Sequence, residues 1–306
     1  MSLIVKDLTK HYGPKTAVNG LSFEIAGPGV YGLIGTNGAG KTTTIRMILD
    51  MVPIDGGSAL WNGTTVKKSG LRYGYMPEER GIYTKTKVLD QLVYFGTLRG
   101  LSKAQALDAA KMWMQRLGVT EYAGMLAEKL SKGNQQKIQL ISTLIHNPEL
   151  IFLDEPFSGL DPLNAQMFHE LISDMAQAGK TIIMSSHQMS TVEQYCNEIT
   201  LLHRGKALVQ GDLKQIKKSY GHTKLLLAAN EAAYAMAEQA GLRLIESRPG
   251  ERVFGLPEQN ADAICEALLR DLLAKDIMPE AFVLSEPTLH EIFIDKVGSA
   301  EGGQAQ

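Results

Sequence analysis

The clearest chemistry in this sequence belongs to a glycine-rich loop of pattern G-x-x-x-x-G-K-T at residues 35–42, between an apolar run at 30–34 and a helix-forming segment at 41–49. Glycines let successive backbone N–H groups point into one concavity, and the following helix adds its positive dipole end, so main chain can hold a polyphosphate. Lys41 supplies a charge for the outer phosphates and Thr42 a hydroxyl for Mg²⁺. A chance glycine turn is the alternative, and the strand-loop-helix context disfavours it. The predicted phosphate-binding residues are Gly35, Asn37, Gly38, Ala39, Gly40, Lys41, Thr42 and Thr43.

Two adjacent carboxylates follow a second apolar run. Residues 150–153 are apolar, and Asp154 and Glu155 come directly after them. A strand buried on both faces does not end in two charges unless a cation or hydrogen-bond donors meet them. Beside a phosphate loop, Asp154 is placed to hold Mg²⁺, directly or through water, and Glu155 to polarise a water for in-line attack on a γ-phosphate. The alternative is a strand whose end simply reaches solvent.

Ser131 and Gly133 stand at the predicted start of a helix. The apolar face of that helix consists of Ile138, Ile141, Leu144 and Ile145. A serine at this position is most simply an N-cap. A helix start that offers Ser, Gly and free N–H groups is equally a site for an anionic γ-phosphate.

Tyr12 and His187 each allow two interpretations. Tyr12 lies on a predicted turn at 11–16, upstream of the loop, where its ring either stacks on an adenine or packs at a sheet edge. His187 ends a third apolar run at 181–187 and either donates to a γ-phosphate oxygen or is a plain surface histidine.

The elements that position these residues predict an α/β domain. Apolar runs and alternating patterns predict strands at 3–8, 21–25, 30–34, 59–63, 72–76, 150–154, 181–187, 198–203 and 207–211. Between 88 and 146 the periodicity becomes helical, with one stripe of Val88, Leu92, Phe95 and Leu98 and another of Ala109, Met112, Trp113 and Leu117. A further helix is predicted at 162–178. The pattern indicates a mainly helical insertion in the α/β domain.

Composition disfavours several classes of protein. The 306 residues carry a net charge of −2 with a pI near 6.4, so no bulk positive charge favours a nucleic-acid partner. Cys196 and Cys265 are far apart and lack metal-ligand spacing, which predicts reduced, buried thiols in a cytosolic protein. No run of 18 apolar residues and no signal peptide is apparent, so any work at a membrane is expected from the cytosolic side through a partner.

Taken together, the motifs resemble those of the nucleotide-binding subunit of an ATP-binding cassette (ABC) transporter. The matching segments, in the family's order, are Tyr12, 35–43, 77–78, 130–135, 152–156, 158–161 and His187. The resemblance implies a P-loop NTPase fold of the ABC type at 1–215, with a helical subdomain at about 85–148. It also implies an ATPase with ATP and Mg²⁺ as cofactors, whose hydrolysis is coupled to transport.

The resemblance assigns roles to the residues that match. It implies that Tyr12 stacks on adenine, that Lys41 and Thr42 hold phosphates and Mg²⁺, that Glu155 is the general base, and that His187 senses the γ-phosphate. Lys41, Glu155 and His187 are therefore the predicted catalytic residues.

The resemblance further implies a dimer of two such domains, arranged head to tail with two ATP molecules between them. Ser131 and Gly133 then contact the γ-phosphate held by the partner domain, which is either a second copy or a paralogue, and Asp161 makes a contact across the dimer. Glu78 stands where many members have Gln, which leaves open whether it is a Mg²⁺ ligand or couples to the membrane partner.

Departures from the family pattern point to a subgroup. Residues 130–134 read Leu-Ser-Lys-Gly-Asn instead of the commonest Leu-Ser-Gly-Gly-Gln, and Thr36 replaces a frequent Pro. Segments 77–83 and 130–137 resemble bacterial sodium- and drug-export ATPases that work with a separate permease. The expected location is the cytoplasmic face of the cell membrane, held there by the permease, with no nucleic acid as a partner.

Two other functions remain as alternatives. A soluble, non-transport ATP switch in translation or DNA metabolism usually has two cassettes or a coiled-coil insertion, and this chain shows neither. A nucleotide-binding regulator with little hydrolysis is the other alternative.

The C-terminal part, at 222–297, predicts a small α+β accessory domain with no chemical motif. Strands at 224–229, 242–247, 252–256 and 281–285 alternate with helices at 231–240 and 261–275 in the order βαββαβ, followed by a helix at 288–296. Residues 298–306 are predicted to be a disordered tail.

Overall fold

The structure is a computed structural model that describes residues 2–79 and 81–302. The chain divides into two compact units, Met1–Gly211 (unit 1) and Asp212–Gln306 (unit 2). Each unit has a hydrophobic core of its own. The α/β fold class and the small α+β C-terminal part predicted from the sequence are confirmed.

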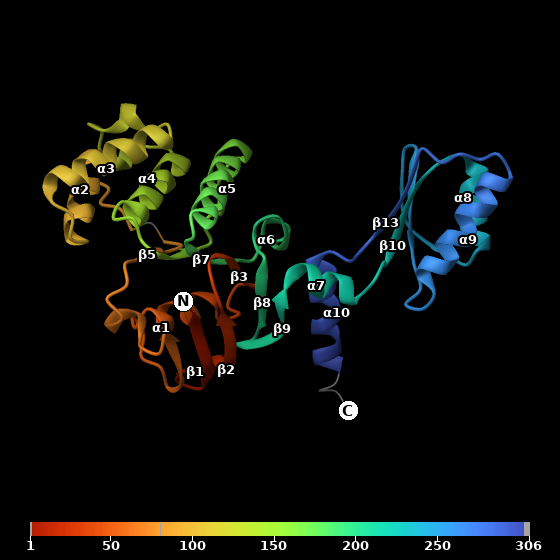
Figure 1. The fold of residues 1–306 in the computed structure, drawn as a ribbon, viewed down its shortest axis with the longest axis horizontal. Helices are drawn as coiled ribbons and strands as arrows, with labels where there is room; N and C mark the ends of the chain where they lie inside the picture. Colours follow the sequence, from red (N-terminus) through yellow and green to blue (C-terminus); the bar gives the residue numbers. More distant parts are fainter. Residues whose placement is uncertain (1, 80, 303–306) are drawn as a thin grey trace. The chain divides into compact units, whose positions relative to one another are not determined.

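The central sheet of unit 1 has the strand order β5-β6-β7-β3-β8-β9 (Figure 1). Its strands are β3 (Gly29–Gly35), β5 (Tyr73–Met76), β6 (Leu150–Asp154), β7 (Thr181–Ser186), β8 (Glu198–His203) and β9 (Lys206–Asp212). The pairs from β5 to β8 are parallel, and every residue of β6 and β7 is buried, as continuous apolar runs predict. The carboxyl ends of β3, β6 and β7 therefore meet at one edge.

Helices and a second sheet cover this central sheet. Helices α5 (Pro162–Gln177) and α6 (Met189–Tyr195) pack on β3 and β7, and α1 (Lys41–Ile48) packs between β3 and the second sheet. The second sheet is antiparallel, with the order β2-β1-β4. Its strands are β1 (Leu3–Tyr12), β2 (Lys15–Ile25) and β4 (Gly56–Trp61).

The turn between β1 and β2 is shorter than predicted. Pairing continues as far as Tyr12 opposite Lys15, so only residues 13 and 14 form the turn, with Gly13 at φ 57°. Tyr12 therefore ends a strand, whereas the sequence placed it on a turn at 11–16. The glycine accounts for the tight reversal, because it adopts positive φ without steric cost.

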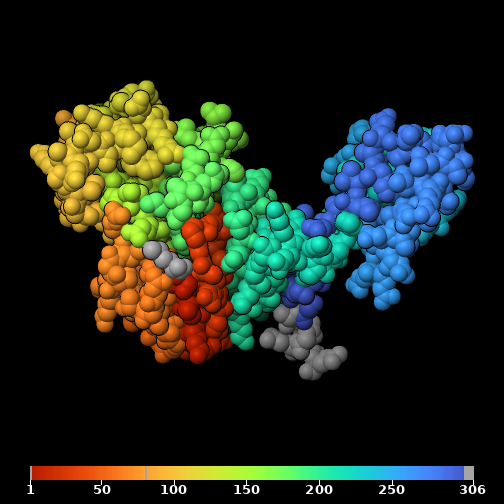
Figure 2. Space-filling model, viewed as in Figure 1, coloured from red at the N-terminus to blue at the C-terminus, as the bar shows by residue number. Residues whose placement is uncertain are grey.

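The predicted helical insertion consists of α2 (Val88–Leu98), α3 (Lys103–Arg116) and α4 (Lys132–Leu144). Figure 2 shows α2 and α3 (yellow) as a lobe above the red and orange part of unit 1. The predicted stripes are partly wrong: Leu98 is 63% exposed and Met112 is 50% exposed. The buried side of α3 instead consists of Ala106, Ala110 and Met114. A Cβ on Gly96 would lie 2.8 Å from the Ala106 Cβ, so a close approach of α2 and α3 selects small side chains there.

Unit 2 contains an antiparallel sheet of order β11-β12-β10-β13. Its elements are α7 (Leu213–Ser219), β10 (Lys224–Ala228), α8 (Glu231–Gln239), β11 (Arg243–Arg248), β12 (Glu251–Gly255), α9 (Ala261–Ala274), β13 (Ala281–Ser285) and α10 (Leu289–Gly302). Helices α8 and α9 lie side by side on the sheet and cover Leu225, Leu227 and Phe254 (Figure 1). From β10 to β13 the observed order is the predicted βαββαβ.

Two helices of unit 2 differ from the prediction. The sequence did not indicate α7, which the Asp212 side chain caps by accepting from the Gln215 N–H at 2.8 Å. Helix α10 continues through Gly302, so the predicted disorder of 298–302 is wrong, while 303–306 lie outside the described residues. The buried Leu289 and Ile292 anchor the first turn of α10, and an existing helix extends at little cost per residue. Within the described residues, no helix is both long and apolar enough to span a lipid bilayer.

Candidate active site

The glycine-rich loop joins the end of β3 to the start of α1, as predicted. Gly35 and Gly40 have φ of 156° and 108°. A Cβ on Gly35 would lie 2.3 Å from the Leu202 carbonyl oxygen, and a Cβ on Gly40 would lie 2.5 Å from that of Ala17. No larger side chain fits at either position, so the backbone path itself requires glycine there.

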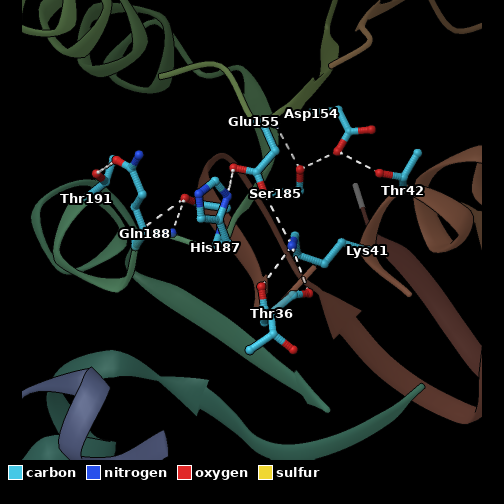
Figure 3. Close-up of polar contacts among 11 residues, drawn as sticks. Thr36, Lys41, Thr42, Asp154, Glu155, Ser185, His187, Gln188 and Thr191 are labelled. Atoms are coloured by element: carbon cyan, nitrogen blue, oxygen red, sulfur yellow. Dashed lines mark hydrogen bonds and ion pairs between the residues drawn. The ribbon is translucent and has the colours of Figure 1, made fainter. Parts of the chain in front are cut away.

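Lys41 curls back over the loop and is 6% exposed. Its ammonium donates to the carbonyl oxygens of Gly35 at 2.8 Å and Thr36 at 3.3 Å. The same nitrogen lies 3.2 Å from Oε1 of Glu155, which is 5% exposed (Figure 3). A buried ion pair is stable only with further hydrogen bonds, and the loop carbonyls provide them here. The loop and the carboxylate strand thus meet, as the sequence predicted.

Asp154 ends β6 and is 1% exposed. Its Oδ1 accepts hydrogen bonds from the Thr42 hydroxyl at 3.2 Å and from the Ser185 hydroxyl (Figure 3). Its Oδ2 is buried and has no hydrogen-bond partner among the described residues. Burial raises the pKa of Asp154, whereas the hydrogen bonds from Ser185 and Thr42 lower it. A buried carboxylate oxygen without a donor, beside a hydroxyl, is the ligand set that Mg²⁺ prefers, so these residues fit the ion.

Glu155 is held in a left-handed backbone conformation with φ 52°. Its N–H donates to the Ser185 hydroxyl at 3.0 Å, and its Oε2 accepts from the His187 N–H at 3.3 Å. The Nδ1 atom of His187 lies 2.9 Å from the same Oε2. A left-handed residue other than glycine costs about 1–3 kcal/mol, and such strain concentrates at functional sites. The strained turn directs the Glu155 carboxylate toward Lys41 and away from solvent.

A pocket of ≈ 280 Å³ lies over the loop. Its lining includes most of the predicted nucleotide-binding residues: Tyr12, Asn37, Gly38, Ala39, Gly40, Lys41, Thr42, Thr43, Glu78 and Glu155. Tyr12 is 49% exposed there, and Nζ of Lys10 lies over its ring, 5.6 Å from the centroid. A second pocket of ≈ 290 Å³ is lined by Glu78, Asp154 and Glu155 together with Lys132. Glu78 thus borders both pockets.

Ser131, Gly133 and Asp161 form a separate group and line neither pocket. The Ser131 hydroxyl caps α4 by accepting from the Asn134 N–H at 3.3 Å. Asn164 connects the group. Its backbone N–H and its Nδ2 donate to the Asp161 carboxylate at 3.0 Å and 2.6 Å. The same Nδ2 lies close to Gly133, since a Cβ built on that glycine would be 3.2 Å from it. The structure therefore brings these three residues together but not to the loop of the same chain.

Two polar residues of the site were not predicted. Ser185 contacts both carboxylate residues, and it lies directly opposite Asp154 in the parallel register of β6 and β7. Gln139 holds the segment around Glu78, because its Nε2 donates to the carbonyl oxygens of Pro77 at 2.7 Å and Glu79 at 3.1 Å. A polar residue at the carboxyl end of an apolar strand was the available signal for Ser185. No local pattern marks Gln139.

Comparison with known proteins agrees with this geometry. The family model described as ABC transporter matches residues 18–158. A second model, described as the C-terminal domain of DrrA1-3-like ATP-binding proteins, matches 211–297.

Similar proteins that match 72–97% of this chain carry the same description. An uncharacterized ABC transporter ATP-binding protein of Bacillus subtilis (strain 168), YhaQ, is 42% identical over 97% of this chain and 99% of its own length. The bacitracin transport ATP-binding protein BcrA of Bacillus licheniformis is 34% identical over 78% of this chain and 80% of its own. A solved ATP-binding subunit of an ABC transporter has a TM-score of 0.66 and 28% identity, covering 72% of this chain and 94% of that one. None of these three relatives is named for translation or DNA metabolism. The resemblance inferred from the motifs is confirmed: the chain belongs to the ABC transporter ATP-binding proteins.

Proposed function

We propose that this chain is the ATP-hydrolysing subunit of an exporter, and that ATP binding and hydrolysis between two nucleotide-binding subunits drive a separate transmembrane permease. The observation that carries the proposal is the convergence of Lys41, Asp154, Glu155 and His187, which come from three strand ends and contact one another or Thr42 beside the glycine-rich loop. A cation for phosphates, a carboxylate for a metal and a second carboxylate for water are the parts that phosphoryl transfer to water needs.

The mechanism follows from the positions of these groups. Loop N–H groups and the start of α1 bind the triphosphate of ATP, and Lys41 neutralises its outer oxygens. A water beside Glu155 attacks the γ-phosphorus while the bond from that phosphorus to the oxygen of the β-phosphate breaks. Glu155 accepts the proton of the water, and the products are ADP and phosphate. His187 orients Glu155 through its N–H and Nδ1 contacts, and we assign it the additional role of γ-phosphate contact.

Thr42 and Asp154 are the residues that would hold Mg²⁺. The ion, when bound, neutralises charge on the β- and γ-phosphates. The hydrogen bonds from Thr42 and Ser185 already occupy Oδ1 of Asp154 and leave Oδ2 available. Glu78 borders the same space from β5, and we assign it either to this ligand set or to contact with the permease.

The second half of the site comes from a partner copy. Ser131, Gly133 and Asp161 are grouped around Asn164, away from the loop, as expected for residues that complete the partner's site. The start of α4 offers free N–H groups to a γ-phosphate there. Relatives named for bacitracin transport and linearmycin resistance favour export as the direction and a permease as the membrane partner. Such a permease would hold the subunit at the cytoplasmic face of the membrane.

Substitution of Glu155 by Gln tests the proposal. The amide keeps the size of the side chain and removes the proton acceptor, so ATP turnover falls by at least about a thousandfold, as loss of a transition-state group does. ATP still binds, and an ATP-bound dimer accumulates, which light scattering after size-exclusion chromatography detects.

The matched control is Glu79→Gln. Glu79 is exposed, lies near Glu78 in the chain and lines neither pocket, so its charge loss leaves turnover unchanged. Normal turnover in Glu155→Gln would remove Glu155 from the role of base.

A further inference from the structure

A pocket larger than the one over the loop lies within unit 2, for which the sequence predicted no chemistry. It measures ≈ 480 Å³, against ≈ 280 Å³ for the pocket over the loop. Three segments of unit 2 enclose it: 220–224 at the start of β10, 256–258 after β12, and 287–295 at the start of α10. Pockets of this volume are in the range that holds small molecules.

The walls of this pocket are largely apolar. They include Leu256, Pro257, Pro287 and Ile292, of which Pro287 and Ile292 are buried. Two prolines and a buried isoleucine have few accessible conformations. The wall they form therefore loses little conformational entropy when a ligand binds. The apolar body of a ligand would lie against this wall.

The charges of the pocket leave an excess of carboxylate. Lys224 forms an ion pair with Glu291, so the two neutralise each other. Glu258 and Asp295 also line the pocket. Glu258 has no ion-pair partner among the described residues, and the ion pair of Asp295 is a 3.8 Å contact with the exposed side chain of Lys296. The Nδ1 atom of His222 lies 2.7 Å from Oδ1 of Asp262, which is not part of the lining, so the unpaired charge of the lining is the carboxylate of Glu258.

The ring of Tyr220 favours a ligand with a positive group. The ring of Tyr220 already lies under an ammonium, because Nζ of Lys296 is 5.4 Å from its centroid. Aromatic faces attract cations, and this corner of the pocket therefore suits a cationic group.

We propose that this pocket of unit 2 binds a small organic cation with an apolar body. Its positive group lies between Glu258 and Asp295, beside Tyr220, and its body lies on Leu256 and the prolines. An inorganic anion is disfavoured by the carboxylates. The described residues contain no cluster of three or more metal-ligating side chains, so a divalent metal is disfavoured as well. The site is separate from the ATP pocket and independent of the function proposed above.

Binding of tetraphenylphosphonium to the full-length protein, measured by isothermal titration calorimetry, tests the proposal. Tetraphenylborate has the same shape and the opposite charge. The ratio of the two affinities therefore measures the effect of charge, with the hydrophobic contact kept the same. The phosphonium ion binds at least about tenfold more tightly than the borate, and its affinity falls as salt rises from 50 to 500 mM, because screening weakens the carboxylate field.

Variants identify the pocket as the binding site. Each of Glu258→Gln and Asp295→Asn weakens phosphonium binding about three- to fivefold, and the double variant weakens it about tenfold or more. Lys296→Met removes the competing ammonium and tightens binding by a few fold. Matched controls are Glu238→Gln on α8 and Asp271→Asn on α9, which remove exposed carboxylates of unit 2 outside the pocket and leave binding unchanged.

Three results would overturn the proposal: no saturable binding of the phosphonium ion, equal affinity for both ions, or an unchanged affinity in the double variant. Glu258 and Asp295 are exposed, so their substitution leaves the core of unit 2 intact.

Discussion

The charged side chains beside the glycine-rich loop of unit 1 and those of the β11–β12 pair in unit 2 lie in opposite environments. In unit 1, Lys41, Asp154 and Glu155 are almost fully buried and contact one another or the same serine. In unit 2, Arg248 contacts Glu246 and Glu251 in ion pairs whose side chains are exposed or nearly so. An exposed pair contributes about 0–1 kcal/mol, whereas burying charges costs several kcal/mol that the pair itself barely offsets.

The comparison indicates why each set of charges is present. Burying three charges at one sheet edge does not stabilise the fold. Their presence in unit 1 therefore indicates a ligand whose own charges compensate theirs. The exposed pairs of unit 2 keep its surface polar, and its stability comes from the apolar core around Phe254. The following three changes test this contrast, beginning with the largest expected effect.

Lys41→Met has the largest expected effect. It removes the charge that neutralises the outer phosphates and leaves Glu155 buried without its cation. We expect kcat/KM for ATP to fall about ten-thousandfold, which corresponds to about 5.4 kcal/mol, because the transition state loses the cation that neutralises its developing charge. Steady-state ATPase assays and nucleotide titrations measure this effect.

Lys15→Met is the control for that change. Lys15 lines the same pocket but is exposed, so water and salt screen its charge. We expect kcat/KM to fall no more than about fivefold, in line with the small worth of exposed charge pairs. Equal losses in the two variants would contradict the contrast between buried and exposed charge.

Sequence patterns predicted the parts of the fold and site that depend on local residue types. The glycines and Lys41 identify the loop from consecutive residues alone, so no contact with a distant part of the chain has to be known. The carboxylates after β6 were assigned to the phosphate loop because two charges at the end of a buried strand need a cation or hydrogen-bond donors beside them. The βαββαβ order of unit 2 likewise followed from alternating patterns.

What the sequence could not predict depends on how elements pack. Ser185 contacts Asp154 because the two residues lie opposite each other in the pairing of β6 and β7. They are 31 residues apart in the chain, and the sequence of neither strand predicts that register. The buried side of α3 is set by its close approach to Gly96 of α2, which favours alanines over the bulkier residues chosen from periodicity. The pocket of unit 2 joins segments from 220 to 295, so it exists only after packing.

Phe254→Ala has the next largest expected effect and is confined to unit 2. Phe254 is fully buried in β12, and loss of its ring leaves a cavity that costs about 4 kcal/mol. Because each unit has its own core, we expect the unfolding transition of unit 2 to shift to lower urea while ATP affinity changes less than about twofold. Circular dichroism and nucleotide titration measure the two quantities.

Phe152→Ala in β6 is the matched change in unit 1. Phe152 is also fully buried, but it lies two residues before Asp154. We expect a similar loss of stability, now in the transition of unit 1, together with weaker ATP binding. If Phe254→Ala weakened ATP binding as much as Phe152→Ala, the two cores would not be independent.

Ser185→Ala has the smallest expected effect and tests how the buried carboxylates are held. The change removes one hydrogen bond to Asp154 and one acceptor for the Glu155 N–H. We expect a loss of about 1–3 kcal/mol in the free energy of unfolding, because a buried polar group loses a partner. We also expect about tenfold lower turnover with a higher Mg²⁺ requirement, since Ser185 orients Asp154.

The pH dependence distinguishes this role from simple loss of packing. Burial holds the pKa of Asp154 above its ordinary value, and the Ser185 hydrogen bond lowers it, so the variant has a higher pKa still. A carboxyl with a raised pKa in the folded state binds more protons folded than unfolded, so stability falls as pH rises above the ordinary Asp value of about 4. The stability deficit of Ser185→Ala in urea, without nucleotide, is therefore larger at pH 8 than at pH 5. Ser186→Ala is the control, because its buried hydroxyl contacts only the backbone of Gln188 and its deficit stays the same at both pH values.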